Sequence, residues 1–321
     1  MKTFLIVGFV ILFVLTVLFV WYYFFGETGE IKKAKKEFEI FGLKEGFVPQ
    51  GITYLKQFKK FLISGYVSKK NEASRIYVVN AETYEFEKYV TLKFLTGRLY
   101  DGHAGGITNY GDSCWVSSEG RAYRFVTHDV INAKNGDSVR VIDSFQTYNN
   151  ADFCFVFDGY LWIGEFYRLT KFKTDIAHHT INDDGEQSHA LAFGFKLSKC
   201  VTCGTEGEIP ERALTLPDST QGVAVSNQTI FVSTSYGITP SKVYEYENVL
   251  LKKSQKSLIV NEKNVSLWEL SSKNLRKTRI LPEMAEEVEF VDGKLFVLFE
   301  SASNKYKLVT RTRINHVFSI K

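Results

Sequence analysis

The sequence predicts an all-β fold, a five-bladed β-propeller with six blades as the alternative, preceded by an N-terminal transmembrane helix. Short β-branched and aromatic runs alternate with turn signals throughout residues 37–321, without a long helical period. One hairpin pattern recurs five times in this region, which indicates a repeat architecture. A stretch without any charge opens the chain at residues 3–25.

Composition sets broad limits on the function. The 321 residues are 45% apolar and 15% aromatic, which suits one large β-rich core. The net charge of +4 is near balance and does not favour a nucleic-acid partner. Four cysteines in a chain of this length exclude a small disulfide-built fold.

The apolar stretch at residues 3–25 is long enough to cross a bilayer, since about 20 helical residues suffice. Aromatic residues 21–23 fit an interfacial belt, and no small-residue cleavage site follows them. We therefore predict a signal-anchor over residues 1–25 and a linker over 26–36. Four lysines after the span favour a cytoplasmic domain, whereas a signal-anchor ahead of one large domain favours the outside. We expect a single-pass membrane protein with an extracytoplasmic propeller.

Each repeat starts with a polar or small pair, followed by an apolar run, a turn and a second apolar run, the pattern of a β-hairpin. Asp158-Gly159 and Asp292-Gly293 are hairpin turn dipeptides at equivalent positions. Two further apolar runs follow most hairpins, so one repeat is four antiparallel strands, a propeller blade. In the fourth repeat we assign these runs to residues 266–270 and 278–281. The five repeats start at Gln50, Gly105, Asp152, Gln221 and Glu286.

The last repeat contains only three candidate strands before the chain ends. Residues 37–41, Glu-Phe-Glu-Ile-Phe, can supply the fourth strand. A ring closed in this way leaves no open sheet edge. We therefore predict a propeller domain at 37–321 whose last blade is closed by the strand at 37–41. A β-sandwich or several small sheets are the alternative folds.

Three short motifs carry a family resemblance: Pro49-Gln-Gly-Ile-Thr, His103-Ala-Gly-Gly-Ile-Thr and Thr220-Gln-Gly-Val-Ala. With the repeats, they resemble the β-propeller group of gluconolactonase/regucalcin, paraoxonase, NHL-repeat and YncE-like proteins. The chain also looks like membrane-anchored bacterial propellers. The resemblance to the lactonases implies a central calcium or other divalent ion on Glu, Asn and Asp side chains. This chain departs from that pattern because no repeat starts with Asn.

In a propeller, the starts of the inner strands and the connections from second to third strands open on one face of the central channel. We therefore expect a polar ring around one axial mouth. The predicted catalytic residues are His103, Asp152 and Glu286, and the predicted metal ligands are Asp152 and Glu286. The predicted ligand-binding residues are Gln50, Gln221, Glu165, Arg168, Tyr236, Glu287 and Glu300.

Three interpretations of this ring remain open. Carboxylate and amide oxygens suit calcium or another divalent cation. A histidine or a crowded carboxyl with a shifted pKa suits acid–base catalysis. Polar groups also satisfy strand ends and channel water. The functional hypothesis is a membrane-anchored propeller that binds a small polar ligand or divalent cation, as a metal-assisted hydrolase of lactone, ester or sugar. The alternative is a non-catalytic scaffold for an envelope protein or a glycan.

Two other motifs lie outside the repeats. Cys200 and Cys203 lack the strand-to-helix context of a redox motif, so either a local disulfide or two thiols is expected. His178 and His179 lie in a polar insert with Asp183 and Asp184, where these side chains could bind a transition metal. The spacing matches no standard metal site, so we predict a solvated loop that projects over one face.

Overall fold

The computed structural model describes residues 7–17, 29–200, 202–254 and 256–321. Residues 7–17 are helical, and the rest of the span expected at 3–25 lies outside the described residues. No helix in the described part of the chain is long and apolar enough to cross a membrane.

The strands within the described ranges form an all-β, propeller-like fold with sheets of eight, six, four, four and two strands. Antiparallel pairing divides most of these strands into five groups of four, here called units, and one parallel pairing joins the first two units into the eight-stranded sheet. The first contains β2 (Phe47–Leu55), β3 (Lys60–Val67), β4 (Arg75–Asn80) and β5 (Phe86–Lys93). The second contains β6 (Gly106–Tyr110), β7 (Ser113–Ser118), β8 (Arg121–Val126) and β9 (Ser138–Gln146). The third contains β10 (Phe153–Phe157), β11 (Tyr160–Gly164), β14 (Ala190–Lys196) and β15 (Arg212–Leu216). The fourth contains β16 (Thr220–Val225), β17 (Thr229–Thr234), β18 (Ser241–Glu247) and β21 (Leu275–Leu281). The fifth contains β22 (Ala285–Val291), β23 (Lys294–Phe299), β24 (His316–Ile320) and β1 (Lys35–Glu39).

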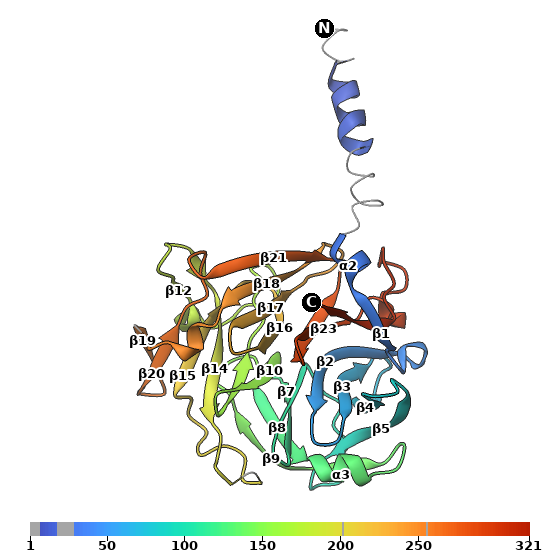
Figure 1. The fold of residues 1–321 in the computed structure, drawn as a ribbon, viewed down its shortest axis with the longest axis vertical. Coiled ribbons are helices and arrows are strands. Elements are labelled where there is room, and N and C mark those ends of the chain that lie inside the picture. Colours follow the sequence, from blue (N-terminus) through green and yellow to red (C-terminus); the bar gives the residue numbers. More distant parts are fainter. Residues whose placement is uncertain (1–6, 18–28, 201, 255) are drawn as a thin grey trace.

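The first strands of the units surround a common centre. β2 contacts β6, β6 contacts β10, β10 contacts β16, β16 contacts β22, and β22 contacts β2. In Figure 1 the labels of β2, β10 and β16 lie near the middle, whereas β1, β5, β9 and β21 lie at the periphery. Five hydrophobic clusters fill the spaces between neighbouring units, so side-chain packing holds the ring together.

The N-terminal strand completes the C-terminal unit. β1 pairs antiparallel with β24, and Lys35 lies opposite Ser319. The strand begins inside the segment expected to be a linker and ends two residues before the predicted end at residue 41. A short helix, α2 (Gly29–Lys33), precedes it.

The predicted third strand of the fourth repeat is wrong. Residues 266–268 belong to β20 (Lys263–Trp268), which pairs with β19 (Lys256–Val260) and runs parallel to β15 of the third unit. β18 takes the third place because it pairs with both β17 and β21. The β19–β20 hairpin therefore widens the third unit to a six-stranded sheet.

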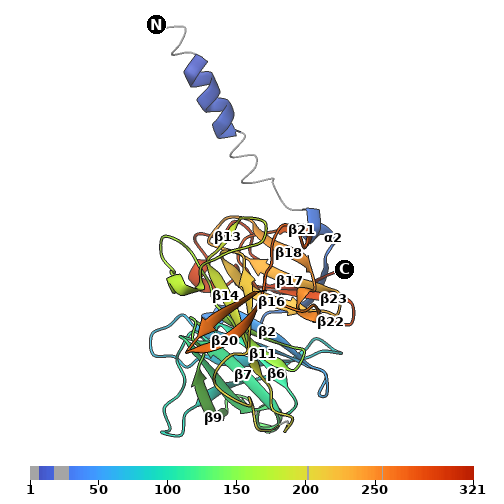
Figure 2. The ribbon, with the colours of Figure 1, turned by 90° about the vertical axis from the view of Figure 1, so that its left-hand side faces the viewer.

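Short elements fill the connections. They are α3 (Thr127–Asn132), the 3-10 turns η1 (Leu43–Glu45), η2 (Ile176–His178), η3 (Val249–Leu251) and η4 (Asn304–Tyr306), and the hairpin β12 (Thr180–Ile181) with β13 (Gln187–Ser188). Figure 2 shows the ring from the side, with β13 and β9 near opposite ends of the view.

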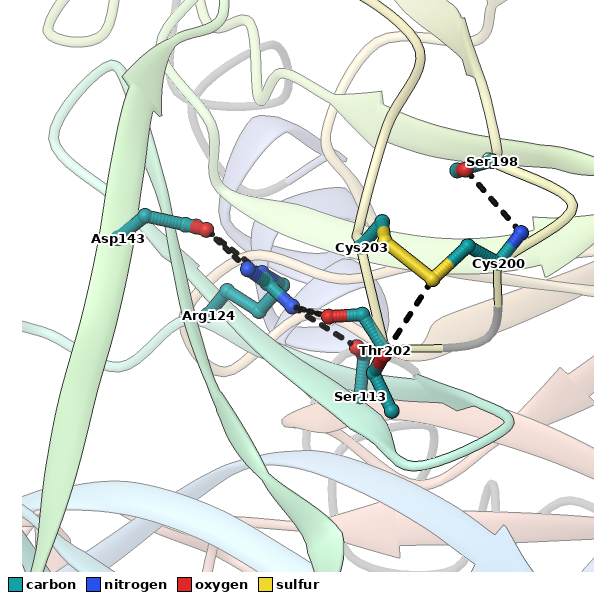
Figure 3. Close-up of a disulfide and its surroundings, with 7 residues drawn as sticks. All are labelled: Ser113, Arg124, Asp143, Ser198, Cys200, Thr202 and Cys203. Carbon is teal, nitrogen blue, oxygen red and sulfur yellow. Dashed lines mark hydrogen bonds and ion pairs between the residues drawn. A yellow bond between two sulfur atoms is a disulfide. The ribbon is translucent and has the colours of Figure 1, made fainter.

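Cys200 and Cys203 form a disulfide, the first of the two expected states (Figure 3). Its loop contacts the second unit, since Arg124 Nη1 donates to the Thr202 carbonyl at 2.6 Å. Arg124 Nε donates to the Asp143 carboxylate at 2.8 Å. The loop is thereby fixed to a buried, paired arginine. Cys114 and Cys154 are buried free thiols.

Candidate functional site

A cavity of about 440 Å³ opens where the inner strands begin. Residues from widely separated parts of the chain meet in its wall. Those that the sequence placed at the axial mouth and that line this cavity are Gln50, His103, Asp152, Gln221, Tyr236, Glu286 and Glu300.

β2 supplies one regular side of the axis. Three residues of β2 contact successive carboxyl groups, Gln50 through its side-chain amide and Ile52 and Tyr54 through their backbone N–H groups. The Gln50 amide donates to Glu300 Oε2 at 3.1 Å. The backbone N–H of Ile52 donates to Glu287 at 2.8 Å, and that of Tyr54 donates to Glu289 at 3.1 Å. The carboxyl groups are thus arranged in order along the central axis, starting from the cavity.

Glu286 and Glu300 form a hydrogen-bonded carboxyl pair in the cavity wall. Their exposed fractions are only 3% and 9%. Burial raises the pKa of Glu286 well above its usual value, and the adjacent Glu300 charge adds to the rise. Burial also raises the pKa of Glu300, to about 7. Two such close carboxyls do not both ionise readily, so at least one of them stays protonated near neutral pH.

Two tyrosines and a lysine surround the pair. Tyr306 hydrogen-bonds Glu300, and Tyr66 hydrogen-bonds both Tyr306 and the Lys305 ammonium group. The charge of Lys305 acts on both carboxyl groups in favour of their ionised forms. The cluster therefore combines a proton donor, a proton acceptor and a fixed positive charge.

His103 stacks on Tyr66, with ring centroids 4.7 Å apart. His103 is exposed at the rim of the cavity. Desolvation by the groups around it lowers the pKa of His103 to about 4, and the nearby Lys305 charge adds to this effect. The imidazole is therefore neutral at neutral pH, and it can accept or donate one hydrogen bond there.

Asp152 contributes a separate carboxyl group to the same cavity. Its Oδ2 accepts the Phe166 backbone N–H at 2.7 Å. Burial raises the pKa of Asp152 to about 7, partly offset by that hydrogen bond, and the Glu165 charge adds to the rise. The carboxyl that pairs with Glu286 is thus Glu300, and Asp152 responds instead to Glu165.

Glu287 does not line the cavity, contrary to its predicted ligand-binding role. It is 1% exposed, and its Oε2 accepts the N–H groups of Ile52 at 2.8 Å and Ile107 at 3.3 Å. The Cys154 N–H, from a third inner strand, also hydrogen-bonds this carboxyl group. Oε1 is buried without a hydrogen-bond partner in the described structure. Glu287 therefore joins three inner strands at the axis.

Glu165 and Arg168 also lie outside the cavity wall, contrary to prediction. Glu165 is fully buried and accepts the Leu191 N–H at 3.0 Å, while His178 Nδ1 lies 2.8 Å from the same oxygen. The expectation that His178 is solvated is therefore wrong, because this contact holds the insert against the third unit. Arg168 lies over the Tyr236 ring, 3.7 Å from its centroid, and thus supports a wall residue.

Sequence reasoning missed an aromatic part of the wall. Phe166 and Phe172 have ring centroids 5.4 Å apart, and Phe166 and Tyr236 have centroids 6.3 Å apart. Phe166 follows the predicted strand end at Glu165 and could have been included on that basis. Lys305 and Tyr306 lie in a long connection without any repeat pattern, so no signal pointed to them.

The donor set does not form an evident metal centre. Within residues that the structure describes, no group of three or more His, Cys, Asp or Glu side chains could hold an ion. A nearby ammonium group at Lys305 also disfavours a divalent cation at Glu286 and Glu300. Calcium binding by Asp152 and Glu286 therefore stays a prediction.

Because its central carboxyl groups have raised pKa values, we expect the stability of the protein to depend on pH, and a variant at Glu289 can test this. Burial raises the pKa of Glu289 from 4.5 to about 8, partly offset by the Tyr54 N–H. A carboxyl group whose pKa is raised in the folded state adds most to the free energy of unfolding below pH 4.5. That contribution is lost as the pH rises towards 8. We expect Glu289→Gln to gain stability over the parent chain by about 1–3 kcal/mol between pH 4.5 and pH 8, since one pKa unit corresponds to about 1.4 kcal/mol before solvent screening.

Equilibrium urea unfolding at pH 4.5, 6 and 8 measures this difference. Glu208→Gln, at an exposed position, is the control and should give a constant difference at all three values. A constant difference for Glu289→Gln as well would contradict the raised pKa.

Comparison with known proteins finds no sequence match and only distant structural similarities. No protein-family model and no curated protein sequence matches this chain. A glutaminyl cyclase from Myxococcus xanthus is similar in structure, with a TM-score of 0.47 and 9% identity over 90% of this chain and 93% of that one. BamB from Moraxella catarrhalis gives a TM-score of 0.36 and 11% identity, over 85% and 82% of the two chains. The Myceliophteria thermophila Cps50 (Swd1) β-propeller domain gives 0.34 and 9%, over 86% and 98%.

Proposed function

We propose that this protein is a five-bladed propeller whose axial cavity binds a small uncharged polar ligand and hydrolyses it by acid–base catalysis. The observation that carries the proposal is the hydrogen-bonded Glu286–Glu300 pair inside the cavity. The closed cycle of inner-strand contacts supports five blades, with the domain beginning at β1.

The two carboxyl groups can complement each other in one reaction. As a water oxygen attacks an ester or lactone carbonyl carbon, the ionised carboxyl takes the proton from that water. The bond to the leaving oxygen breaks, and the protonated carboxyl gives its proton to that oxygen. The pair again holds one proton after the step, so the cycle balances.

Neighbouring groups orient and stabilise this pair. Gln50 and Tyr306 hydrogen-bond Glu300, which fixes its position. The Lys305 ammonium lies close enough to offset negative charge that develops on the substrate oxygen. The aromatic side chains of Phe166, Phe172 and Tyr236 offer an apolar surface for a ring or an acyl group.

We further propose that the propeller is extracytoplasmic and attached to a membrane by the apolar segment at residues 3–25. The Cys200–Cys203 disulfide supports an oxidising compartment, since cytosolic proteins seldom keep such bonds. The uncharged sequence of the segment supports attachment.

Activity assays with three probes test the catalytic proposal: p-nitrophenyl acetate, gluconolactone and p-nitrophenyl glucoside. We expect turnover of at least one, and a fall in kcat of about 10²–10⁴-fold in Glu286→Gln and in Glu300→Gln. Glu119→Gln, an exposed carboxyl near the mouth, is the matched control and should keep the parent rate.

A bell-shaped pH profile that loses one limb in each variant would support shared acid–base roles. Absence of turnover with all three probes would overturn the hydrolase proposal. Turnover that a chelator abolishes and calcium restores would replace proton sharing with the metal-assisted route.

A further inference from the structure

Three loops around the cavity mouth form an exposed surface of unusual composition. We define the mouth patch as the exposed apolar residues Leu169, Phe172, Ile238, Leu308 and Val309. Their exposed fractions are 69%, 42%, 44%, 95% and 54%. Phe172 lines the cavity itself, and the others lie within three residues of lining residues.

The same loops carry positive charge alone. Segments 166–174, 235–240 and 301–310 contain five basic residues and no acidic residue. None of the five forms an ion pair with any residue that the structure describes. These basic residues are Arg168, Lys171, Lys173, Lys305 and Lys307.

Exposed aliphatic side chains beside lysines that form no ion pair with the described residues fit a lipid surface better than a protein partner. The centres of protein–protein interfaces are depleted of lysine. Interfacial membrane binding instead combines buried apolar side chains with attraction between basic residues and anionic lipid headgroups. The absence of acidic residues in these loops complements such headgroups.

We propose that the mouth patch docks on an anionic bilayer surface, so that the cavity opens toward the lipid headgroups. This contact is separate from the proposed attachment through residues 3–25, and it requires no catalytic activity. Exposed leucines insert at the boundary between headgroups and acyl chains while the lysines remain among the headgroups.

Site-specific fluorescence tests the contact. The full chain carrying Leu308→Cys is labelled with bimane and reconstituted in vesicles of phosphatidylcholine, with or without 30% phosphatidylglycerol. Nitroxide-labelled lipid is included as a quencher. We expect a blue shift and at least about twofold stronger quenching in the anionic vesicles than in neutral ones.

Leu251→Cys is the matched control. Leu251 is 58% exposed and precedes Lys252 and Lys253, so it is also apolar and flanked by basic residues. Asn248, at the start of the turn that contains Leu251, donates a hydrogen bond to the Ser226 carbonyl in the β16–β17 hairpin. Because β16 begins beside Gln221 at the mouth and ends at this hairpin, Leu251 lies at the end of the fourth unit away from the mouth. A bimane group at this position should stay unquenched in both kinds of vesicle.

A charge-reversal variant completes the test. Lys173→Glu with Lys307→Glu should remove the extra quenching at position 308 and leave the spectrum in neutral vesicles unchanged. Equal quenching in neutral and anionic vesicles, equal quenching at 251 and 308, or no quenching at 308 would each overturn the proposal. The last result would leave the patch as a protein-binding surface. None of these results depends on whether the cavity is catalytic.

Discussion

Replacing Glu287 with alanine is expected to destabilise the protein by about 3–5 kcal/mol. The carboxylate accepts N–H groups from Ile52 and Ile107 in the centre of the ring, and the Cys154 N–H contacts it as well. Each buried donor left without an acceptor costs about 1–3 kcal/mol, and the space left by the side chain adds to that cost. Equilibrium urea unfolding at pH 6 measures the change.

Glu287→Gln is the informative companion variant. Its amide oxygen can accept the same N–H groups, so we expect a loss below about 2 kcal/mol. Failure of the alanine variant to fold, beside a folded glutamine variant, would agree with the bridging role. Losses under about 1 kcal/mol in both variants would show that the inner strands do not depend on this carboxyl group.

Gly222→Ala is expected to cost at least about 3 kcal/mol, at the upper end of the range for overpacking. A Cβ atom at this position would lie 2.6 Å from Glu287 Cα and 2.8 Å from its Cγ. The first of these contacts is with backbone, which cannot turn aside. Neighbouring inner strands therefore approach so closely here that only glycine fits. Thermal and urea unfolding both report the loss.

Gly207→Ala provides the control for this substitution. A Cβ there would meet no atom within 4 Å, and the residue does not require a positive φ. Its stability should stay within about 1 kcal/mol of the parent chain. Similar small effects at both glycines would mean that the fourth and fifth units can separate without cost.

The sequence contained enough information to predict most strands and some of the residues that meet at the mouth. Hairpins such as Asp158-Gly159 and Asp292-Gly293 fix local register, and alternation then determines which side chains face the core. That β18, and not residues 266–268, forms the third strand of the fourth unit could not be predicted in this way. Both segments have strand patterns, and which one pairs with β17 depends on contacts far along the chain.

The chemistry of the site was harder to predict than the fold. A register shift in β22 between Ala285 and Val288 accompanies two successive inward-facing carboxyl groups, which simple alternation forbids. The predicted partner for Glu286 was Asp152, but the hydrogen-bonded partner is Glu300, from the end of the next strand. Lys305 and Tyr306 take part through a connection whose path no local pattern specifies.

The pairing of β1 with β24 has a consequence for biosynthesis. Lys35 is among the first residues of the domain to be made, and its partner Ser319 is among the last. At about 5–20 residues per second, tens of seconds separate their synthesis. Throughout that interval β1 is an unpaired strand that can join a wrong edge. Closing the ring therefore requires a contact of very high sequence separation, which slows this last step of folding.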